Sequence, residues 1–438
     1  MTDPLPQTIR VAMCDLNGVM RGKRVAGEYL PKLKSGAVRI PLSVINVDIT
    51  GADIKDSPLV FETGDADGVM IPTERDPVPL PWLGMDQPLV QMELRMGRDD
   101  PFDADPRRAL RKVLDRYAGK GWNVVAATEL EFTLVDDRGD DLGRVKNPQN
   151  GQPLDMPEIL ALGHMDAFDG FLSDLYKGAE AMGIPAQTAT SESGVGQFEI
   201  TLHHSDALRA ADDTWLFKAL IRGMARKHGF AATFMAKPFA EDAGNGMHVH
   251  FSIWDSEGRN MMDESTPEGE ARLMGAIAGC LDAMHGSTLL FAPHANSYER
   301  LVPGAHAPTS ICWGHENRTV ALRIPRGASA NRRIEHRVAG GDTNPYLVLA
   351  GILGAAFIGI EEGRTPPAPI QGNAYEQDCP QLAASWAAAI DAFESDPVMA
   401  QVFPARLRDC LLRCKRQELA LLDDVAIEAH WKTYLDTA

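Results

Sequence analysis

Four segments of this sequence alternate between apolar and polar side chains, which is the periodicity of a β-strand with two different faces. They are residues 122–134, 197–203, 247–254 and 333–338. In the first segment, Glu129 and Glu131 lie on one face of the expected strand, while Leu130 and Phe132 lie on the other. We therefore expect a sheet whose apolar face packs on a core and whose polar face is available for chemistry.

The polar faces of these segments concentrate carboxylates, histidines and arginines. The residues are Glu129, Glu131, Glu199, Thr201, His203, His248, His250, Ser252, Arg333, Glu335 and Arg337, with Glu192 in the loop before the second segment. One such strand alone is more typical of a solvated surface, and one histidine alone is more often structural. Five carboxylates and a histidine on several strands instead favour a Mg²⁺ or Mn²⁺ site, because these ions prefer oxygen ligands and accept an imidazole. Without cations, the crowded carboxyl groups would have raised pKa values.

Arginines form a second concentration, although the whole chain has a net charge of -18. They are Arg300, Arg318, Arg323, Arg333 and Arg337. The acidic balance argues against a general nucleic-acid or anionic-membrane protein, so the arginines are interpreted as clamps for phosphate and carboxylate groups. Structural ion pairs are the alternative that the sequence leaves open. Since neither GxGxxG nor GxxxxGK[ST] occurs, metals with arginines favour phosphoryl transfer from ATP to a carboxylate.

The chain changes character near Asp103. Residues 1–102 are rich in β-branched residues, glycine and proline, which predicts short strands and tight turns. Asp105 is then expected to cap a helix that begins at Pro106. Further helices are expected over 206–228, 268–285 and 345–362 and in the tail from residue 379. The predicted fold class is α+β, with a small N-terminal β domain (1–102) and a large α+β domain (103–438), rather than a doubly wound dinucleotide fold.

Six cysteines without a CxxC pair indicate reduced thiols. Cys410 and Cys414, one helical turn apart, are interpreted as packing residues rather than half of a zinc site. The first residues, MTDPLPQTIR, lack the basic and apolar regions of a secretory signal. The longest apolar run, 347–360, is too short for a membrane span and predicts a buried helix. These features predict a cytoplasmic protein.

Several motifs, in order, resemble those of the glutamine synthetase family. They are GVGQFE, NGMHVH, NSYERLVPG, NRTVALRIP, RRIEHR and NPYL. The resemblance implies a β-grasp N-terminal domain, followed by a catalytic domain whose antiparallel sheet forms a half-barrel. It also implies a homo-oligomer, a dodecamer of two hexameric rings, with each active site between adjacent subunits. ATP and Mg²⁺ or Mn²⁺ are the implied cofactors, and glutamate and an amine are the implied substrates.

The resemblance also implies roles for individual residues. The first metal would be held by Glu131, Glu192 and Glu199, and the second by Glu129, His248 and Glu335. Glutamate would be held by Asn245, Gly246, Arg300 and Arg337. ATP would be held by His250, Ser252, Arg318, Arg323 and Arg333. Catalytic roles would fall to His306, Arg318 and Asp48, of which Asp48 would complete the amine pocket across the subunit interface.

One motif departs from the family pattern. In RLVPGAHAP, Ala305 and His306 stand where typical members carry a tyrosine and a glutamate that closes over the ammonium site. A pocket with less negative charge and more room favours an organic amine, with His306 as a general base. The γ-glutamylpolyamine and γ-glutamylmethylamide synthetase branches are therefore the expected ones, with a polyamine such as putrescine preferred. Ammonia as the substrate, a guanidino kinase and a catalytically silent structural or sensor relative are the alternatives.

Overall fold

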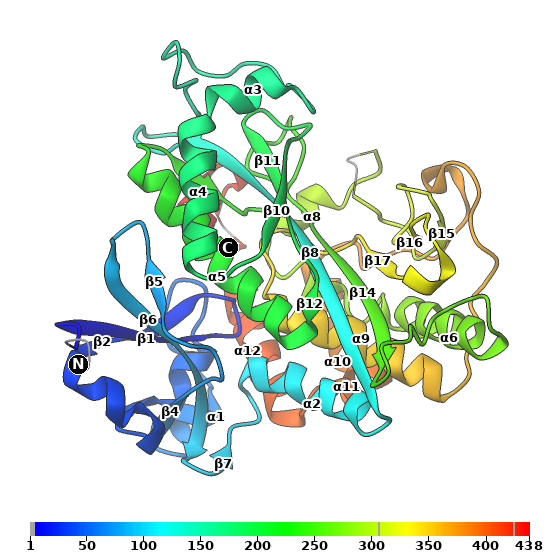
Figure 1. Cartoon of the computed structure of the whole chain (residues 1–438), viewed down its shortest axis with the longest axis horizontal. Coiled ribbons are helices and arrows are strands. Elements are labelled where there is room, and N and C mark those ends of the chain that lie inside the picture. The colour runs from blue at the N-terminus through cyan, green and yellow to red at the C-terminus, as the bar shows by residue number, and fades with distance from the viewer. Residues whose placement is uncertain (1–4, 305–306, 424) are drawn as a thin grey trace.

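The computed structural model describes residues 5–304, 307–423 and 425–438 of the 438-residue chain. Two β-sheets form its framework, and helices pack on both of them (Figure 1). The first sheet comes from the N-terminal part of the chain, and the second contains the four segments with the predicted polar faces. No helix within these described ranges is long and apolar enough to cross a membrane.

The first sheet has seven strands in the described chain, in the order β2-β1-β6-β4-β3, with β5 and β7 paired to β6. The strands are β1 (Thr8–Cys14), β2 (Met20–Ala26), β3 (Val38–Pro41), β4 (Asp67–Pro72), β5 (Val78–Leu80), β6 (Gly84–Gly97) and β7 (Asp100–Pro101). The short helices η1 (Gly27–Ser35), η2 (Leu42–Asn46) and α1 (Pro58–Phe61) connect them. The strands predicted before residue 102 are therefore confirmed, whereas the β-grasp topology stays a prediction.

The second sheet has ten strands in the described chain, in the order β10-β11-β8-β14-β17-β16-β15, with β9, β12 and β13 also paired to β8. The strands are β8 (Trp122–Asp136), β9 (Gly143–Arg144), β10 (Ala186–Ser191), β11 (Gln197–Leu202), β12 (Ser205–Asp206), β13 (Ala231–Thr233), β14 (Met247–Asp255), β15 (Trp313–His315), β16 (Leu322–Ile324) and β17 (Ile334–His336). The pairs from β10 to β17 along this order are antiparallel. The long strand β8 pairs with five other strands of the described chain, β9, β11, β12, β13 and β14.

Helices occupy the segments where they were expected and several others that the sequence analysis did not identify. They are α2 (Pro106–Ala118), α3 (Leu162–Ala167), α4 (Asp169–Ala181), α5 (Ala207–Lys227), α6 (Pro267–Ala283), α7 (Thr288–Phe291), α8 (Ser297–Arg300), α9 (Pro345–Glu361), α10 (Trp386–Ser395), α11 (Pro397–Val402), α12 (Ala405–Leu422) and α13 (Trp431–Tyr434), with short turns η3 (Ser329–Asn331), η4 (Ala374–Glu376) and η5 (Ile427–Ala429). The side chain of Asp105 accepts a hydrogen bond from the backbone N–H of Arg108, which confirms the predicted cap of α2.

Helix α9 is buried along almost its whole length, as the apolar run predicts. It packs closely on α6, and glycines make this approach possible. A Cβ atom on Gly279 of α6 would lie 2.2 Å from the carbonyl oxygen of Ala355 of α9. Any other residue at position 279 would push the two helices apart, so this contact fixes one wall of the core behind the second sheet.

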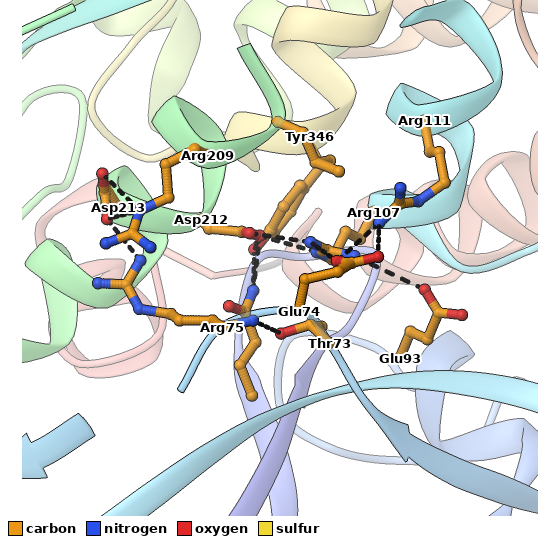
Figure 2. A network of polar contacts seen from close by, with 12 residues as sticks. Thr73, Glu74, Arg75, Glu93, Arg107, Arg111, Arg209, Asp212, Asp213 and Tyr346 are labelled. Atoms are coloured by element: carbon orange, nitrogen blue, oxygen red, sulfur yellow. Dashed lines mark hydrogen bonds and ion pairs between the residues drawn. The ribbon is translucent and has the colours of Figure 1, made fainter. Parts of the chain in front are cut away.

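Buried charged side chains join the first sheet to the helices of the second part (Figure 2). Asp212 of α5 accepts two hydrogen bonds from Arg107 of α2, at 2.9 and 3.0 Å. It also accepts one from Gln91 of β6 at 2.6 Å and one from the hydroxyl of Tyr346 of α9 at 2.8 Å. One carboxylate therefore connects one strand of the first sheet with three helices.

The neighbouring carboxylate, Asp213, makes a second set of contacts (Figure 2). It accepts hydrogen bonds from Arg75, in the β4–β5 connection, and from Arg209, one turn earlier on α5. We call these residues the junction network: Arg75, Gln91, Arg107, Arg209, Asp212, Asp213 and Tyr346. Its arginines pair with its aspartates, so the two parts of the molecule meet mainly through paired charges, although Nε of Arg75, Oε1 of Gln91 and Nη1 of Arg107 are buried without a hydrogen-bond partner among the described residues.

Candidate active site

Strand register places the predicted site residues opposite one another. Glu131 of β8 faces Glu199 of β11, and Glu129 of β8 faces His248 of β14. On the other side of β14, His250 faces Glu335 of β17. Directly opposite residues of an antiparallel pair project on the same face of the sheet, so the polar residues of four strands form one surface. The prediction that these segments share a polar face is confirmed.

Glu129 is the centre of the histidine contacts. Its Oε2 lies 3.1 Å from Nδ1 of His248, and its Oε1 lies 2.9 Å from Nε2 of His250. Burial opposes the charge on Glu129, but the hydrogen bonds and charges of the two histidines outweigh burial and hold the pKa of this carboxyl well below its usual range. Glu129 is therefore a fixed negative charge, close to two possible metal ligands.

Glu199 has the opposite electrostatic character. Burial, followed by the charges of Glu131, Glu129 and Glu192, raises its pKa to about 9. Burial and Glu131 likewise raise the pKa of Glu192. These shifts are what crowded carboxylates show when nearby positive charge does not compensate them. A divalent cation would remove the repulsion, so the site is electrostatically suited to one.

Two groups of side chains bring possible ligand atoms within 4.8 Å of one another. They are Glu129 with Glu199 and His248, and Glu129 with His250 and Glu335. Buried Nδ1 of His250 has no hydrogen-bond partner among the described residues, and such an orphaned nitrogen fits a ligand role. Oxygen-rich sets with an imidazole fit Mg²⁺ or Mn²⁺. The second group includes His250, which was expected to bind ATP rather than metal. The expected division of the ligands into two sets stays a prediction.

Arg300, Gly246 and Glu131 lie together beside this cluster. The N–H of Gly246 donates to the carboxylate of Glu131, and a Cβ at Gly246 would lie 2.7 Å from Nη2 of Arg300 and 3.2 Å from Oε2 of Glu131. The Nη1 of Arg300 donates to the carbonyl oxygen of Val338 at 2.8 Å. Any other residue at position 246 would therefore require the guanidinium of Arg300 to move. The guanidinium of Arg300 lies next to a backbone segment whose N–H and C=O both pair with Glu131, and its remaining N–H donors can hold a substrate carboxylate.

Asn245, the residue before this glycine, uses its side chain inside the protein. Its Oδ1 accepts hydrogen bonds from Thr133 and Gln197 at 3.0 Å each, and its Nδ2 donates to the carbonyl oxygen of Met235 at 2.9 Å. Asn245 thus fixes the loop that carries Gly246. Direct binding of glutamate by its side chain stays a prediction.

The predicted arginine clamps occupy different environments. Arg323 and Arg337 both pair with Glu335, the former at 2.7 Å, so the ion-pair alternative describes their contacts in this structure. The charges of Arg337, His248, His250 and Arg323 outweigh the burial of Glu335 and lower its pKa. Arg318 lines a separate pocket of about 650 Å³ beside residues 369–372. Among the described residues, Arg323 and Arg337 are thus the predicted clamps that form an ion pair with a candidate metal ligand.

A pocket of about 480 Å³ opens beside Glu129 and His250. Ser252 and Arg333, both expected to bind ATP, line it. It is also lined by residues that the sequence interpretation missed, namely Gln187, His204, Trp254 and Asn331. Trp254 could have been found, because it continues the two-residue alternation after Ser252, and its Nε1 donates to Oγ of Ser252 at 2.8 Å. The other three lie outside the alternating segments or beyond a strand end.

Asp48 lies in another part of the structure. Its carboxylate accepts hydrogen bonds from Thr50, Ala52 and Gln417 of α12, and it lines a pocket of about 860 Å³ between the N-terminal part and α12. Within the single described chain, that pocket shares no lining residue with the one beside Glu129. Ala305 and His306 lie outside the described residues, so the structure gives no position for the predicted base.

A mainly antiparallel sheet that presents crowded carboxylates and imidazoles on one face is typical of a metal-dependent catalytic domain. The chain belongs to the glutamine synthetase family, since residues 103–434 match the family described as "Glutamine synthetase, catalytic domain". This finding confirms the resemblance seen in the sequence motifs.

Individual relatives are similar over nearly their whole length. The chain is 36% identical to gamma-glutamylputrescine synthetase PuuA of Escherichia coli (strain K12), covering 99% of this chain and 93% of that protein. It is 32% identical to glutamate–isopropylamine ligase of Pseudomonas sp, covering 98% and 95%. The fold is similar to that of a solved GmaS/ADP complex, with a TM-score of 0.83, 29% identity and coverage of 98% and 97%.

Proposed function

We propose that this protein is an ATP-dependent ligase that joins the γ-carboxylate of L-glutamate to an organic amine. The observation that carries the proposal is the gathering of carboxylates, imidazoles and arginines on one face of the second sheet, beside a pocket of about 480 Å³. The names of two relatives, a γ-glutamylputrescine synthetase and a glutamate–isopropylamine ligase, support the same chemistry.

The reaction has two steps. A γ-carboxylate oxygen of glutamate attacks the γ-phosphorus of ATP, and ADP leaves. The amine nitrogen then attacks the carbonyl carbon of γ-glutamyl phosphate, phosphate leaves, and the amine loses a proton to a base. The first step is needed because a carboxylate alone is a poor electrophile, and the second requires a base that is free near neutral pH.

Residues of the polar face have distinct roles in this proposal. Glu129, Glu131, Glu192, Glu199, His248 and Glu335 would hold the divalent cations, with His250 as a further candidate because its ring contacts Glu129. The cations would offset negative charge on the phosphates. Arg300 and Gly246, with Asn245 and Arg337, would orient glutamate. Ser252, Arg323 and Arg333 would hold ATP, and Arg318 would contact the transferred phosphoryl group.

The preferred amine in this proposal is organic, with a diamine such as putrescine first. The similarity to the putrescine enzyme of E. coli and the isopropylamine ligase supports this preference, as does the alanine–histidine pair at 305–306 in the sequence. A γ-glutamylmethylamide synthetase is the second candidate, supported by the overall similarity to GmaS. Glutamine synthetase activity with ammonia is the third.

The proposal extends to domain organisation and assembly. Residues 1–102 would form a β-grasp domain and residues 103–438 the catalytic domain. A cytoplasmic homo-oligomer of two hexameric rings would place Asp48 of one subunit at the amine pocket of the next. The position of Asp48 beside a pocket on its own N-terminal part supports this arrangement, because a surface hollow can receive a neighbouring subunit.

The test is release of phosphate from ATP in the presence of glutamate and Mg²⁺. Putrescine, isopropylamine, methylamine, ethanolamine and ammonium are compared, and each amide is identified by its mass. A large preference for one organic amine supports the proposal. Highest kcat/KM with ammonium assigns the chain to glutamine synthetases, and a phosphorylated product without an amide assigns it to kinases. No turnover with any amine would leave the silent relative as the explanation.

A further inference from the structure

A second pocket, of about 420 Å³, lies between the β1–β2 turn, the C-terminal half of α5 and the end of the chain. None of its lining residues lines the pocket beside Glu129. Lys218 and Arg222 of α5 line it, one helical turn apart, so their side chains project from the same face of the helix. The pocket therefore contains two cations that the proposed reaction does not use.

Neither cation forms an ion pair with an acid in the described part of the chain, although the charge of Asp342 opposes the fall in the pKa of Lys218 and that of Asp436 opposes the fall for Arg222. The Lys218 side chain is buried, with 7% of the residue exposed, and its Nζ donates to the carbonyl oxygen of Thr343 at 3.3 Å, which is a long hydrogen bond. The Nε and Nη2 atoms of Arg222 are buried without a hydrogen-bond partner among the described residues. Buried unpaired donors of this kind cost free energy unless a ligand supplies acceptors.

The positive charges of Lys218 and Arg222 repel each other. Burial, followed by the charge of Arg222, lowers the pKa of Lys218 to about 7. Burial lowers the pKa of Arg222 to about 10, and the charge of Asp436 only partly opposes this. Arg226, at the same pocket, differs because Asp137 and Asp436 pair with it at 2.7 and 3.2 Å. Within this pocket, Lys218 and Arg222 are thus the cations that form no ion pair with the described residues.

Apart from Thr437 and the paired Arg226 and Asp436, the remaining pocket wall is apolar and aromatic. It includes Trp82, Trp215, Val19 and Met20. Trp82 packs directly on the backbone next to Arg222, since a Cβ at Gly223 would lie 2.4 Å from its ring. Trp215 is held by a hydrogen bond from its Nε1 to the carbonyl oxygen of Gly18 at 3.1 Å. Such a wall can cover a carbon skeleton while the cations bind its acid group.

We propose that this pocket binds a small organic carboxylate, whose carboxylate group lies between Lys218 and Arg222 and whose apolar part packs on Trp82 and Trp215. The carboxylate supplies acceptors to Nε and Nη2 of Arg222, which have none among the described residues, and a further acceptor to Nζ of Lys218 beside Thr343. Two positive charges with one fork-shaped donor match a carboxylate well, and the indole rings exclude water from the pair. The site is independent of the proposed ligase chemistry.

The position of Lys218 also connects this site to the glutamate-binding region. Its acceptor, the carbonyl of Thr343, is adjacent in sequence to Asp342, and Asp342 accepts a hydrogen bond from Ser297 of α8. Helix α8 ends at Arg300, which lies beside Gly246. An occupant of the pocket would therefore act on a segment only a few residues from the predicted glutamate ligands, which suits an effector site.

Benzoate and its neutral analogue benzamide are suitable probes, with binding measured by calorimetry on the full-length protein. We expect benzoate to bind the wild type, benzamide to bind at least tenfold more weakly, and both Lys218→Met and Arg222→Met to weaken benzoate binding at least tenfold. Arg116→Met is the matched control, because Arg116 stacks on Phe357 at 4.6 Å much as Arg222 stacks on Phe234 at 4.9 Å, but outside the pocket. Equal binding of benzamide, or unchanged benzoate binding in both pocket variants, overturns the proposal.

Thermal unfolding without ligand gives a second, independent readout. Lys218→Met and Arg222→Met each remove a buried cation that lacks an acid partner, so their Tm values should equal or exceed that of the wild type. A fall of several degrees in both variants would show that the cations serve the fold itself, and this would overturn the proposal even if benzoate binding were lost. Neither readout uses turnover, so the outcome is separate from the test of the ligase function.

Discussion

The polar face of the second sheet and the junction network are both buried and both charged, but they are organised in opposite ways. At the polar face, Glu199 lies among other carboxylates and its pKa rises to about 9. In the junction network, Asp212 receives hydrogen bonds from Arg107, Gln91 and Tyr346. Like charges brought together make a site that a cation can stabilise, whereas opposite charges brought together make a permanent connection.

The largest effect is expected at the centre of the junction network. Asp212→Ala removes the acceptor of three buried donors and leaves the guanidinium of Arg107 without its closest partner. The free energy of unfolding should fall by about 3 kcal/mol, the lower end of the range for breaking a buried ion pair, because Glu74 and Glu93 still lie 3.2 and 3.6 Å from the guanidinium of Arg107. Urea denaturation measures the change. Asp255→Ala, at an exposed pair with Arg259, is the control, and an equal loss in both variants would contradict the role of burial.

The second prediction is that replacing a carboxylate of the polar face stabilises the fold, in contrast to Asp212→Ala. Because the pKa of Glu199 rises to about 9 on folding, the folded wild type must hold a proton there at neutral pH; Glu199→Gln removes this cost, so the protein without metal should unfold at a higher urea concentration than the wild type. Its kcat/KM should fall by about 10²-fold, as expected when charge stabilisation at phosphate is lost. Glu180→Gln, on the exposed side of α4, should change neither quantity. A loss of stability in Glu199→Gln would break the comparison.

The third prediction concerns the pH dependence of stability at Asp105, the buried N-cap of α2. Burial raises the pKa of Asp105 to about 6 in the folded protein, against 3.8 for the free group, although hydrogen bonds from Leu94 and Arg108 oppose the shift. The folded state thus holds the proton more tightly, so the stabilisation is complete below pH 3.8 and is lost as the pH rises through about 6.

Asp105→Asn should therefore become more stable relative to the wild type as the pH rises. The difference in the free energy of unfolding between the two proteins should change by about 2 kcal/mol from about pH 4 to about pH 7. Urea denaturation at several pH values measures it. A constant difference across this range would show that Asp105 does not titrate there.

The smallest effect is expected at the edge of the junction network. Arg209→Gln removes a partly exposed partner of Asp213, but Arg75 remains paired to that carboxylate at 2.5 Å. The free energy of unfolding should fall by only about 0.5 kcal/mol. Arg75→Gln is the matched comparison. Because Arg75 is buried, its replacement should lower the free energy of unfolding by a larger amount. Equal losses would mean that exposure does not distinguish the two arginines.

Local patterns predicted much of the fold and part of the candidate site. The two-residue alternation identified β8, β11 and β14 and placed Glu129, Glu199 and His248 on one face, and the structure brings these three together. The cap at Asp105 and the apolar run of α9 were also readable, because each depends on neighbours within a few residues. Strand and helix periods therefore account for which side chains share a surface.

Contacts between distant segments could not be predicted in this way. Arg107 and Asp212 are 105 residues apart, and nothing in the sequence near either one identifies its partner. The same holds for Gln187 and Asn331, which reach the pocket beside Glu129 from a neighbouring strand and a short helical turn. Such pairs follow from the packing of whole elements, which has no local period.

The register of β8 has a consequence for how this chain can change in length. Side chains on a strand alternate, so losing a single residue from the middle of β8 would exchange the faces beyond that point and move Glu129 or Glu131 to where Leu130 now packs. Losing two residues would restore the faces, but each residue of β8 beyond the deletion would then lie opposite a different residue of the neighbouring strands. Substitutions in β8 alter one contact each, whereas deletions there alter many at once, so natural variation in length belongs in the connecting loops.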